Sequence, residues 1–573
     1  MRIILQFLKP YKLQIIVAYA FTLTELIAEL LFPLFLGIMI NEGINAGRMD
    51  KIVMWGSIML FISIISFISG IFNSYFSSHV GNATSYDIRE KLFAKLQRFS
   101  FDILNFYPTS MVVTRFTNDV RQIQNMIFMS LRIMMRAPLM VIGSIFMSFI
   151  INFKISLIFL LTVPLLVSFL YWVLLKGGKL FSLVQEKVDN VNRVIQENIA
   201  GMRIIKAFVR KDFEEKRFDK ENKDLASKSQ TAFRFVEASM PILLFVMNLS
   251  LIFIIWFGNK QSIAGTTSVG DVVAIVNYAL RTAMSISMFT FISLAFSRAR
   301  ASGDRIALIL NEQETKTDQD KKDNDVIKQG KITFSHVSFS YPNHTVPVLE
   351  DIDFTLSDKE TLAIIGATGS GKTSLFQLIP KLYQPKKGTI FIDDIPLDDY
   401  PVKHLRDSIG YVSQNPLLFT GSIADNIRFG KENATMDEII TAAKNAQIHD
   451  SIEQFPNGYE SIVGQKGVNL SGGQKQRISI ARALVRYPKI LMFDDSTSAL
   501  DLNTEQNLLN ALHDYDCSTI IITQKIQTAQ QADRILLLDE GRILAIGTHN
   551  SLLENSKLYQ KIVASQDEIK LSM

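Results

Sequence analysis

The sequence lacks several features that define common classes of protein. Cys517 is its only cysteine, which excludes an intrachain disulfide framework. The net charge is only +5, from 60 basic and 55 acidic residues, and so small an excess does not favour nucleic acid as a partner. No cleavable signal peptide is evident, because the first apolar stretch is too long for one and lacks a small-residue cleavage site.

Apolar sequence is abundant instead, and it is concentrated in the first half of the chain. The mean hydropathy of +0.19 is unusual for a soluble protein. Residues 1–300 are dominated by stretches rich in Phe, Ile, Leu and Met, whereas the remainder reads as a soluble α/β sequence. At 573 residues the chain is also too long for one ordinary domain. These features predict a membrane domain over 1–310 and a soluble domain over 331–573, joined by a polar, aromatic-free linker at 311–330.

Six stretches are each long enough to cross a bilayer, which takes about 20 apolar residues. The long second and fourth connections carry a modest excess of Lys and Arg, which predicts that the N-terminus, these connections and the soluble domain are cytoplasmic. Periodic apolar positions in the connections predict that the spanning helices continue into the cytoplasm. The expected spans are 13–40, 53–80, 126–150, 155–176, 238–258 and 269–297.

The segment TLAIIGATGSGKTS (361–374) has the pattern of a phosphate-binding loop between a strand and a helix. Its glycines let backbone N–H groups point at phosphate oxygens, and the helix start adds a positive dipole end. Lys372 is expected to reach the outer phosphates of ATP, and Thr373 to offer its hydroxyl to Mg²⁺. A glycine turn without a ligand explains the full pattern poorly. The expected nucleotide contacts are Gly366, Gly369, Gly371, Lys372, Thr373 and Ser374.

Two further motifs follow downstream. LSGGQKQR (470–477) places Ser471, Gly472, Gly473 and Gln474 at an expected helix N-terminus, which suits an anion. ILMFDDSTSALD (490–501) is an apolar strand that ends in Asp494 and Asp495, as the magnesium-binding strand of a nucleotide site does. The order of the three motifs is much more specific than any one of them.

Taken together, these motifs resemble those of the ABC transporters, with membrane and ATPase domains fused as in the exporter half-transporters. The resemblance covers nearly the whole chain and is strongest over 333–550. It implies a six-helix all-α transmembrane domain with long cytoplasmic extensions, fused to an α/β ATPase domain that binds ATP and Mg²⁺. It also implies that the segments 114–120 (TRFTNDV) and 197–218 hold short coupling helices that dock on ATPase domains.

The resemblance assigns expected roles to individual residues. Tyr341 resembles the aromatic residue that stacks on adenine, although packing at a strand edge is the alternative. Gln414 and Asp494 resemble the residues on the magnesium side, and Ser498–Asp501 resembles the loop that crosses the dimer interface. In this family two ATPase domains meet head to tail, so that each ATP lies between the phosphate loop of one domain and the LSGGQ segment of the other.

Two positions depart from the family pattern. The hydrolytic glutamate is replaced by Asp495, whose carboxylate is withdrawn by roughly 1 Å, and the histidine that contacts the γ-phosphate is replaced by Gln524, which carries no charge. Because LSGGQ is intact, the chain resembles the degenerate-site subunit of bacterial heterodimeric multidrug exporters. This implies a different second half-transporter as partner in the cell membrane. A slow homodimer that tolerates both changes is the alternative.

The membrane half is expected to select the cargo. Glu25 and Glu29 lie on one helical face of the first span, where they either attract cationic amphipathic compounds or pair with Arg132, Arg136 or Arg281. The sequence leaves three functions open: export of hydrophobic or amphipathic drugs or of lipids, export of a defined cargo such as a peptide, and a nucleotide-gated regulatory subunit.

Overall fold

The computed structural model describes residues 2–312, 327–342, 344, 346–498 and 500–571, so most of the expected linker lies outside the described residues. The chain forms two compact units. The first, which we call the helical unit, comprises Met1–Gln97 and Thr109–Glu312. The second, which we call the α/β unit, comprises Arg98–Pro108 and Gln313–Met573.

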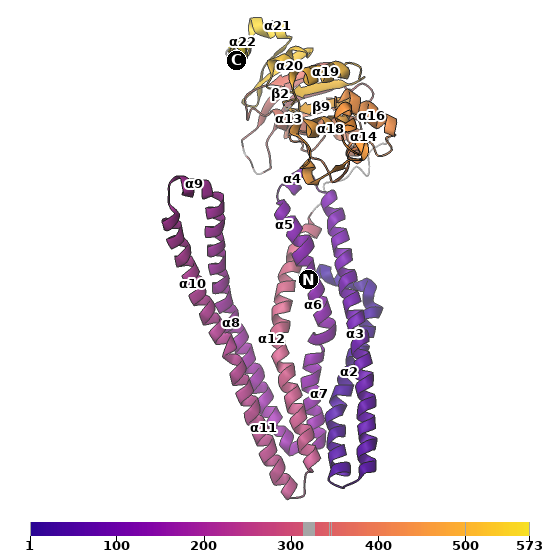
Figure 1. Ribbon diagram of the computed structural model, residues 1–573, viewed down its shortest axis with the longest axis vertical. Coiled ribbons are helices and arrows are strands. Elements are labelled where there is room, and N and C mark those ends of the chain that lie inside the picture. The colour runs from indigo at the N-terminus through magenta and orange to yellow at the C-terminus, as the bar shows by residue number, and fades with distance from the viewer. Residues whose placement is uncertain (1, 313–326, 343, 345, 499, 572–573) are drawn as a thin grey trace. The chain divides into compact units, whose positions relative to one another are not determined.

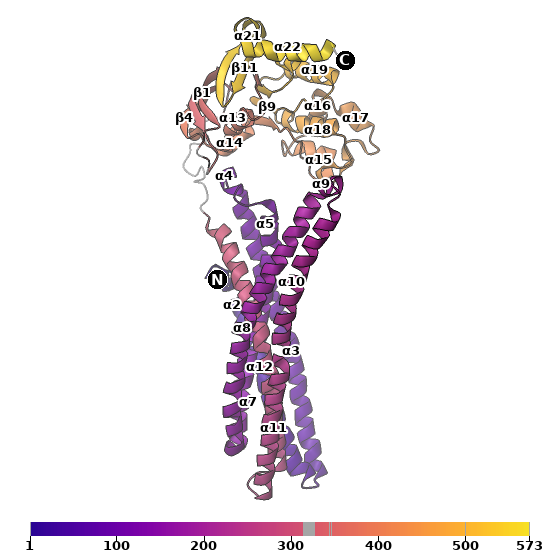
Figure 2. The same ribbon diagram turned by 90° about the vertical axis from the view of Figure 1, so that its left-hand side faces the viewer.

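The helical unit consists of very long helices that lie alongside one another, as Figures 1 and 2 show for α8, α10 and α11. Three π-helical turns interrupt the described helices of this unit, η2 (Met39–Ile44), η3 (Arg115–Asp119) and η4 (Ser130–Met134). The helices are α1 (Arg2–Leu8), α2 (Lys12–Ile38), α3 (Met49–Gln97), α5 (Thr109–Thr114), α6 (Val120–Met129), α7 (Arg136–Ile151), α8 (Phe153–Ala200), α9 (Met202–Ala207), α10 (Lys211–Glu237), α11 (Ser239–Ile263) and α12 (Val269–Asn311), with the short 3₁₀ turn η1 (Lys9–Tyr11).

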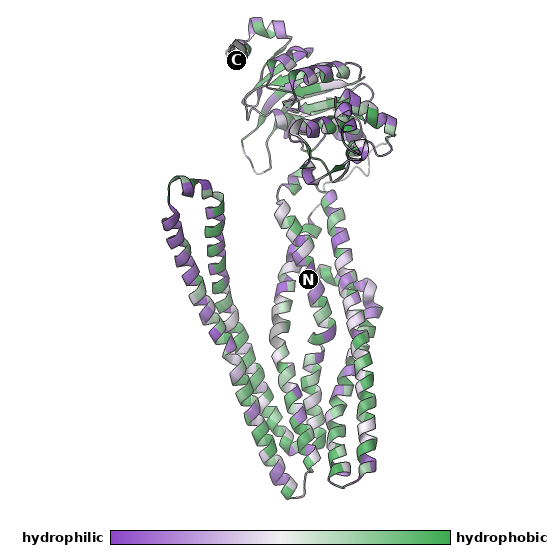
Figure 3. Ribbon diagram, viewed as in Figure 1, coloured by the Kyte–Doolittle hydropathy of each residue, from purple (hydrophilic) through white to green (hydrophobic). Residues whose placement is uncertain are grey.

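Six helical segments among the described residues are long and apolar enough to cross a membrane, which confirms the expected six-span architecture. Several extend well beyond the length that a bilayer requires; α8 alone has 48 residues. In Figure 3 the α8–α11 hairpin is largely apolar toward the α11 end and largely polar toward α9. The apolar parts therefore provide the spans, and the polar parts continue the same helices beyond the membrane.

The turn between α8 and α10 ends in an exposed apolar tip. It contains the short helix α9, and the segment 197–218 was expected to hold such a helix. Ile204, Phe208 and Val209 are 64%, 73% and 85% exposed, respectively. So much exposed apolar surface marks a place where another surface packs.

The spans pack closely where small residues let two backbones approach. A Cβ atom on Gly270 of α12 would lie 2.1 Å from the carbonyl oxygen of Gly37 on α2, which is far inside van der Waals contact. The Gly270 backbone N–H also donates to Asn41 Oδ1 (2.9 Å). The start of α12 is thus held against the end of α2 by glycine packing and by an amide side chain in the π-helical turn η2.

Gly270→Ala is expected to destabilise the helical unit by about 1–3 kcal/mol, because the added methyl group must push α2 and α12 apart. The measurement is the thermal unfolding midpoint of the purified protein in detergent. Gly56→Ala on α3 is the matched control, since a Cβ there would meet nothing within 4 Å. Equal midpoints for the two variants would contradict the close packing.

The α/β unit is built on a six-stranded sheet of order β12-β11-β3-β10-β9-β6, in which only the edge pair β11 and β12 is antiparallel. All five residues of β9 and of β10 are buried, as expected for central parallel strands covered on both faces. An antiparallel sheet of order β2-β1-β4-β5 and a small pair, β7 and β8, complete the strands. The expected fold class, a six-span helical domain fused to an α/β ATPase-type domain, is confirmed.

The strands of this unit are β1 (Ile332–Phe339), β2 (Leu349–Leu356), β3 (Thr361–Ile365), β4 (Lys387–Ile392), β5 (Ile395–Pro396), β6 (Ile409–Val412), β7 (Gly421–Ser422), β8 (Ile462–Val463), β9 (Ile490–Asp494), β10 (Ser518–Ile522), β11 (Arg534–Asp539) and β12 (Arg542–Gly547). The helices are α4 (Phe101–Leu104), α13 (Lys372–Leu378), α14 (Val402–Asp407), α15 (Ile423–Arg428), α16 (Met436–Asn445), α17 (His449–Glu453), α18 (Gly472–Leu484), α19 (Leu502–Leu512), α20 (Ile526–Gln530), α21 (His549–Asn555) and α22 (Lys557–Leu571).

The segment Arg98–Pro108, with helix α4, packs within the α/β unit. Asn105 Nδ2 donates to the hydroxyl of Tyr383 (2.6 Å), and the rings of Phe101 and Tyr383 lie 6.3 Å apart. Residues 114–120, which were expected to dock on an ATPase domain, belong to the helical unit, and their docking stays a prediction.

Candidate nucleotide-binding site

The candidate site lies where three neighbouring parallel strands end. β10 lies between β3 and β9, and Ile522 at its end is opposite both Ile364 on β3 and Asp494 on β9. The loops that follow these strands therefore leave the same edge of the sheet, which is where α/β proteins bind ligands. They line a cavity of about 220 Å³. Its lining contains Gly369, Gly371, Lys372, Thr373, Ser374, Gln414, Asp494, Asp495 and Gln524.

The phosphate loop requires glycine where the backbone turns into α13. Gly371, the residue before the helix, has φ +99°, in the left-handed region that side chains rarely adopt. A Cβ there would also lie 2.8 Å from the Leu349 side chain and 3.0 Å from the carbonyl oxygen of Val348. At Gly366, a Cβ would lie 2.1 Å from the carbonyl oxygen of Leu538. The backbone conformation and the close contacts at Gly366 and Gly371 therefore require glycine at both positions.

Lys372 is largely buried within this loop. Its ammonium group donates to the carbonyl oxygens of Gly366 (2.9 Å) and Ala367 (2.7 Å). Burial lowers the pKa of Lys372, although the nearby carboxylates of Asp495 and Asp494 oppose the shift. The Lys372 ammonium group is thus held by two backbone carbonyls of the loop that is expected to bind phosphate.

Thr373 and Asp494 bring a hydroxyl and a carboxylate together. Thr373 Oγ1 donates to Asp494 Oδ1 (3.2 Å). Burial raises the pKa of the Asp494 carboxyl, against the effect of the hydrogen bond from Thr373. Oxygen ligands of this kind, completed by phosphate oxygens and water, suit Mg²⁺. The residues present therefore fit the metal that was expected here.

Tyr411 on β6 is a contributor to the site that the sequence analysis did not identify. Its hydroxyl is hydrogen-bonded to Asp494, and burial raises the pKa of Tyr411 to about 12. The phenol therefore stays neutral and can only orient the carboxylate. The sequence signal was its position three residues before Gln414, on a strand that pairs with the strand of Asp494.

Asp495 lines the cavity and is held by two amides. Its Oδ2 atom accepts hydrogen bonds from Gln524 Nε2 (3.3 Å) and from Gln414 Nε2 (3.4 Å). The residue has φ +46°, an uncommon conformation for a residue with a side chain. Burial raises the pKa of Asp495, against the hydrogen bond from Gln414. Both positions that depart from the family pattern are therefore in direct contact.

Lys525, next to Gln524, points away from this cluster. Its ammonium group pairs with the buried Glu505 (2.7 Å) and donates to the carbonyl oxygens of Thr497 (3.3 Å) and Leu500 (3.4 Å). The basic side chain thus holds the loop after Asp495, and its charge opposes the effect of burial on the pKa of Asp495. Within that loop, Ala499 lies outside the described residues.

The remaining expected contacts lie beside the cavity or apart from it. The Tyr341 hydroxyl is hydrogen-bonded to Ser374 Oγ (2.9 Å), and its ring packs edge-on against Tyr383 (5.2 Å). Ser471 precedes α18, where its hydroxyl accepts from the backbone N–H of Gln474 and its own N–H donates to the Gln474 side chain. In the described part of the chain, Ser471–Gln474 do not line the cavity, so this segment faces elsewhere.

In the helical unit, the two glutamates of the first span pair with one arginine. Arg136 donates to Glu25 Oε1 (2.9 Å) and to Glu29. Of the three arginine partners considered, Arg136 is therefore the one that the structure supplies. One carboxylate charge remains uncompensated in this triad, and Glu25 Oε2 has no hydrogen-bond partner among the described residues.

Comparison with known proteins agrees with this geometry. Residues 15–286 match the family model of the ABC transporter transmembrane region, and residues 349–498 match that of the ABC transporter ATPase domain. The chain is 50% identical over 565 residues to YfiB of Bacillus subtilis, an uncharacterized ABC transporter ATP-binding protein, with 98% of each chain covered. The chain belongs to the ABC transporter family, as a half-transporter of the exporter type.

Two other relatives carry provisional names that describe multidrug export ATP-binding/permease proteins. One is YgaD of Bacillus subtilis, which is 31% identical over 578 residues, with 98% of each chain covered. The other, from Staphylococcus aureus, is 32% identical over 581 residues, with 98% of this chain and 99% of the relative covered.

Proposed function

We propose that this chain is one half of a heterodimeric exporter that uses ATP to move hydrophobic or amphipathic compounds out of the cell, and that its own ATP site hydrolyses slowly. The contact between Asp495 and Gln524 carries the proposal. In a competent site a longer carboxylate orients the attacking water, and a cationic side chain meets the γ-phosphate. Here the carboxylate of Asp495 is on a shorter side chain, the amide of Gln524 is neutral, and the two side chains are hydrogen-bonded to each other.

In contrast to these two positions, none of the residues expected to bind ATP is replaced. The phosphate loop and Lys372 would hold the β- and γ-phosphates, and Tyr341 would stack on adenine. Thr373, Asp494 and Gln414 would hold Mg²⁺, which neutralises phosphate charge when it is bound. A site that binds firmly and turns over slowly acts as a clamp between two ATPase domains.

Ser471–Gln474 would serve the other nucleotide. This segment faces away from the chain's own cavity and presents the start of the thirteen-residue helix α18. Helix starts attract anions such as the γ-phosphate. A partner with glutamate and histidine at the positions of Asp495 and Gln524 would then carry the fast site, which this chain completes.

For the cargo, the names of two relatives favour multidrug export, and the triad of Glu25, Glu29 and Arg136 favours cationic compounds. The triad leaves one negative charge within the spanning region, where a cationic group would be attracted. Two other functions have less support: the export of lipids or peptides, and a nucleotide-gated regulatory subunit. Glu25→Gln combined with Glu29→Gln tests the charge, and unchanged efflux of cationic dyes would exclude it.

The proposal as a whole is tested by the purified chain without a partner. It is expected to bind ATP but to hydrolyse it well below roughly 1 s⁻¹, a rate at the low end for enzymes. Addition of the partner half-transporter is expected to restore fast hydrolysis. Rapid hydrolysis by this chain alone would show a homodimer and contradict the proposal.

A further inference from the structure

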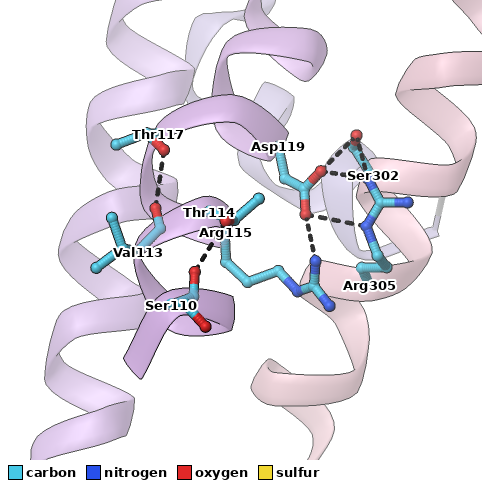
Figure 4. Close-up of polar contacts among 8 residues, drawn as sticks. All are labelled: Ser110, Val113, Thr114, Arg115, Thr117, Asp119, Ser302 and Arg305. Carbon is cyan, nitrogen blue, oxygen red and sulfur yellow. Dashed lines mark hydrogen bonds and ion pairs between the residues drawn. The ribbon is translucent and has the colours of Figure 1, made fainter. Parts of the chain in front are cut away.

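Asp119 is a buried carboxylate in the helical unit, apart from the nucleotide site. It is 2% exposed and is the last residue of the π-helical turn η3, between α5 and α6. Residues from two separate segments of the chain surround it, as Figure 4 shows. A buried charge is costly unless it is fully paired, so its partners define what it does.

Four hydrogen bonds saturate the Asp119 carboxylate. Oδ2 accepts from Arg115 Nη1 (2.9 Å) and from Arg305 Nε (3.0 Å). Oδ1 accepts from Ser302 Oγ (2.8 Å) and from the second arm of Arg305, which also donates to the Ser302 hydroxyl (3.0 Å). The planar Arg305 guanidinium thus donates hydrogen bonds to both carboxylate oxygens, a bidentate geometry that a lysine ammonium group cannot provide.

The backbone next to Asp119 departs from a regular α-helix in two ways. The π-helical turn accommodates one extra residue, a feature that is frequent at functional positions. Thr114 and Thr117 also donate their hydroxyls to the carbonyl oxygens of Ser110 and Val113, each at 2.8 Å, and such bonds often bend helices. This stretch is therefore bent locally, and Asp119 fixes its far end to α12.

The two helices that Asp119 joins lead toward two of the three chain connections between the units, and the third leaves from the end of α3 at Gln97. α5 begins at Thr109, directly after Arg98–Pro108, which belongs to the α/β unit. α12 ends at Asn311, after which the chain continues into the α/β unit. A movement that reaches the helical unit along either of the connections at Thr109 and Glu312 therefore passes an element that Asp119 holds.

We propose that Asp119 is a positioning residue that locks α6 and α12 into one rigid body, so that ATP-driven movement of the α/β unit is passed to both helices together. The inference rests on the proposed function as an ATP-driven exporter. Separating the helices would remove the three hydrogen bonds that Ser302 and Arg305 donate to Asp119, and would leave the buried carboxylate with Arg115 alone and Arg305 without its partner, which is strongly unfavourable. The cluster therefore acts as a permanent link that persists in every state of the transport cycle.

The charge of the cluster is consistent with a permanent link. Asp119 and Arg305 lie outside the expected spans 126–150 and 269–297. Burial alone would raise the pKa of Asp119, but the hydrogen bonds from Arg305, Ser302 and Arg115 hold it below its ordinary value. Arg305 carries its charge throughout, and pairing with Asp119 raises its pKa further. The ion pair consequently stays intact across the cytoplasmic pH range.

The test uses Asp119→Asn in the complete complex, with spin labels at Asn125 of α6 and Ser297 of α12, both exposed. The labels are attached in a Cys517→Ala background, which removes the only native cysteine. With Asp119 present, one narrow distance is expected that Mg·ATP does not change. With Asp119→Asn, the distance distribution is expected to broaden. An equally narrow, nucleotide-independent distance in that variant would overturn the proposal.

The functional readout is dye uptake into inverted vesicles divided by the rate of ATP hydrolysis. Asp119→Asn is expected to lower this ratio by about tenfold, within the usual range of coupling between sites, while hydrolysis continues. Arg305→Lys should give an intermediate loss, and Arg300→Gln, at an exposed arginine on the same helix, none. An unchanged ratio in Asp119→Asn would also overturn the proposal.

If the proposed function is wrong, the unmodified complex already shows it, so this outcome is distinguishable from a failure of the proposed role of Asp119. If that complex hydrolyses ATP but moves no cationic dye, the proposed cargo is wrong, and the distance measurement still decides the role of Asp119. If Asp119→Asn lowers the thermal midpoint of the complex to below the assay temperature, Ser302→Ala, which removes a single hydrogen bond, replaces it in both measurements.

Discussion

Replacing both residues that depart from the family pattern, Asp495→Glu with Gln524→His, is expected to raise ATP turnover at this chain's own phosphate loop by on the order of a hundredfold. Glutamate extends the carboxylate by one methylene toward the attacking water. Histidine breaks the amide contact with position 495 and can place positive charge at the γ-phosphate. In single-turnover hydrolysis by the complex, the slow phase of the unmodified protein is expected to merge with the fast phase.

Asp495→Asn is the matched control for this experiment. It keeps the size of the side chain and its contacts with Gln414 and Gln524, but it removes the carboxylate. Because the proposed fast site lies in the partner, steady-state hydrolysis by the complex should change little. Loss of hydrolysis in Asp495→Asn would show that this carboxylate is the principal catalytic base and would contradict the asymmetric mechanism.

Gly472→Asp is expected to lower hydrolysis by the complex by a hundredfold or more, although the substitution lies outside the chain's own cavity. Gly472 is the first residue of α18 and is exposed, and a Cβ atom added there would meet nothing within 4 Å. A carboxylate at a helix start stabilises the helix, so the fold is expected to persist. It would repel the γ-phosphate that this segment is proposed to bind, and loss of one transition-state donor already costs about 10²–10³ in rate.

Gly472→Ala is the control that distinguishes the effect of the added charge from the effect of the added side chain, because it adds a methyl group without a charge. Its loss of hydrolysis is expected to be clearly smaller than that of Gly472→Asp. The measurement is steady-state phosphate release, together with ATP binding to this chain's own phosphate loop, which neither substitution should alter. A Gly472→Asp complex that hydrolyses at the unmodified rate would show that this segment does not serve the fast site.

The contiguous parts of the site were predictable from the sequence because short-range chemistry fixes them. The strand, glycine turn and helix around Lys372 form one local pattern, and the run of apolar residues before Asp494 can only be a buried strand. The six spans were predictable for the same reason, since each is a single long apolar stretch. The helix that holds the second span, expected to end at 80, continues to Gln97, as the periodic apolar positions after the span predicted.

Long-range choices of partner could not be read from the sequence. Three arginines were equally plausible partners for Glu25 and Glu29, and only the packed helices select Arg136. Lys525 directly follows Gln524, yet it turns to Glu505, which is twenty residues away along the chain. The packing of Arg98–Pro108 within the α/β unit was missed for the same reason, because Asn105 and its partner Tyr383 are far apart in sequence.

The exposed tip between α8 and α10 has a consequence for the life of the protein in the cell. Ile204, Phe208 and Val209 present apolar side chains to water in the single chain. Chaperones and proteases recognise such surfaces on proteins that lack their partners, so a surplus of this subunit would be removed. In the proposed heterodimer, degradation of whichever half is in surplus would then keep the amounts of the two halves equal.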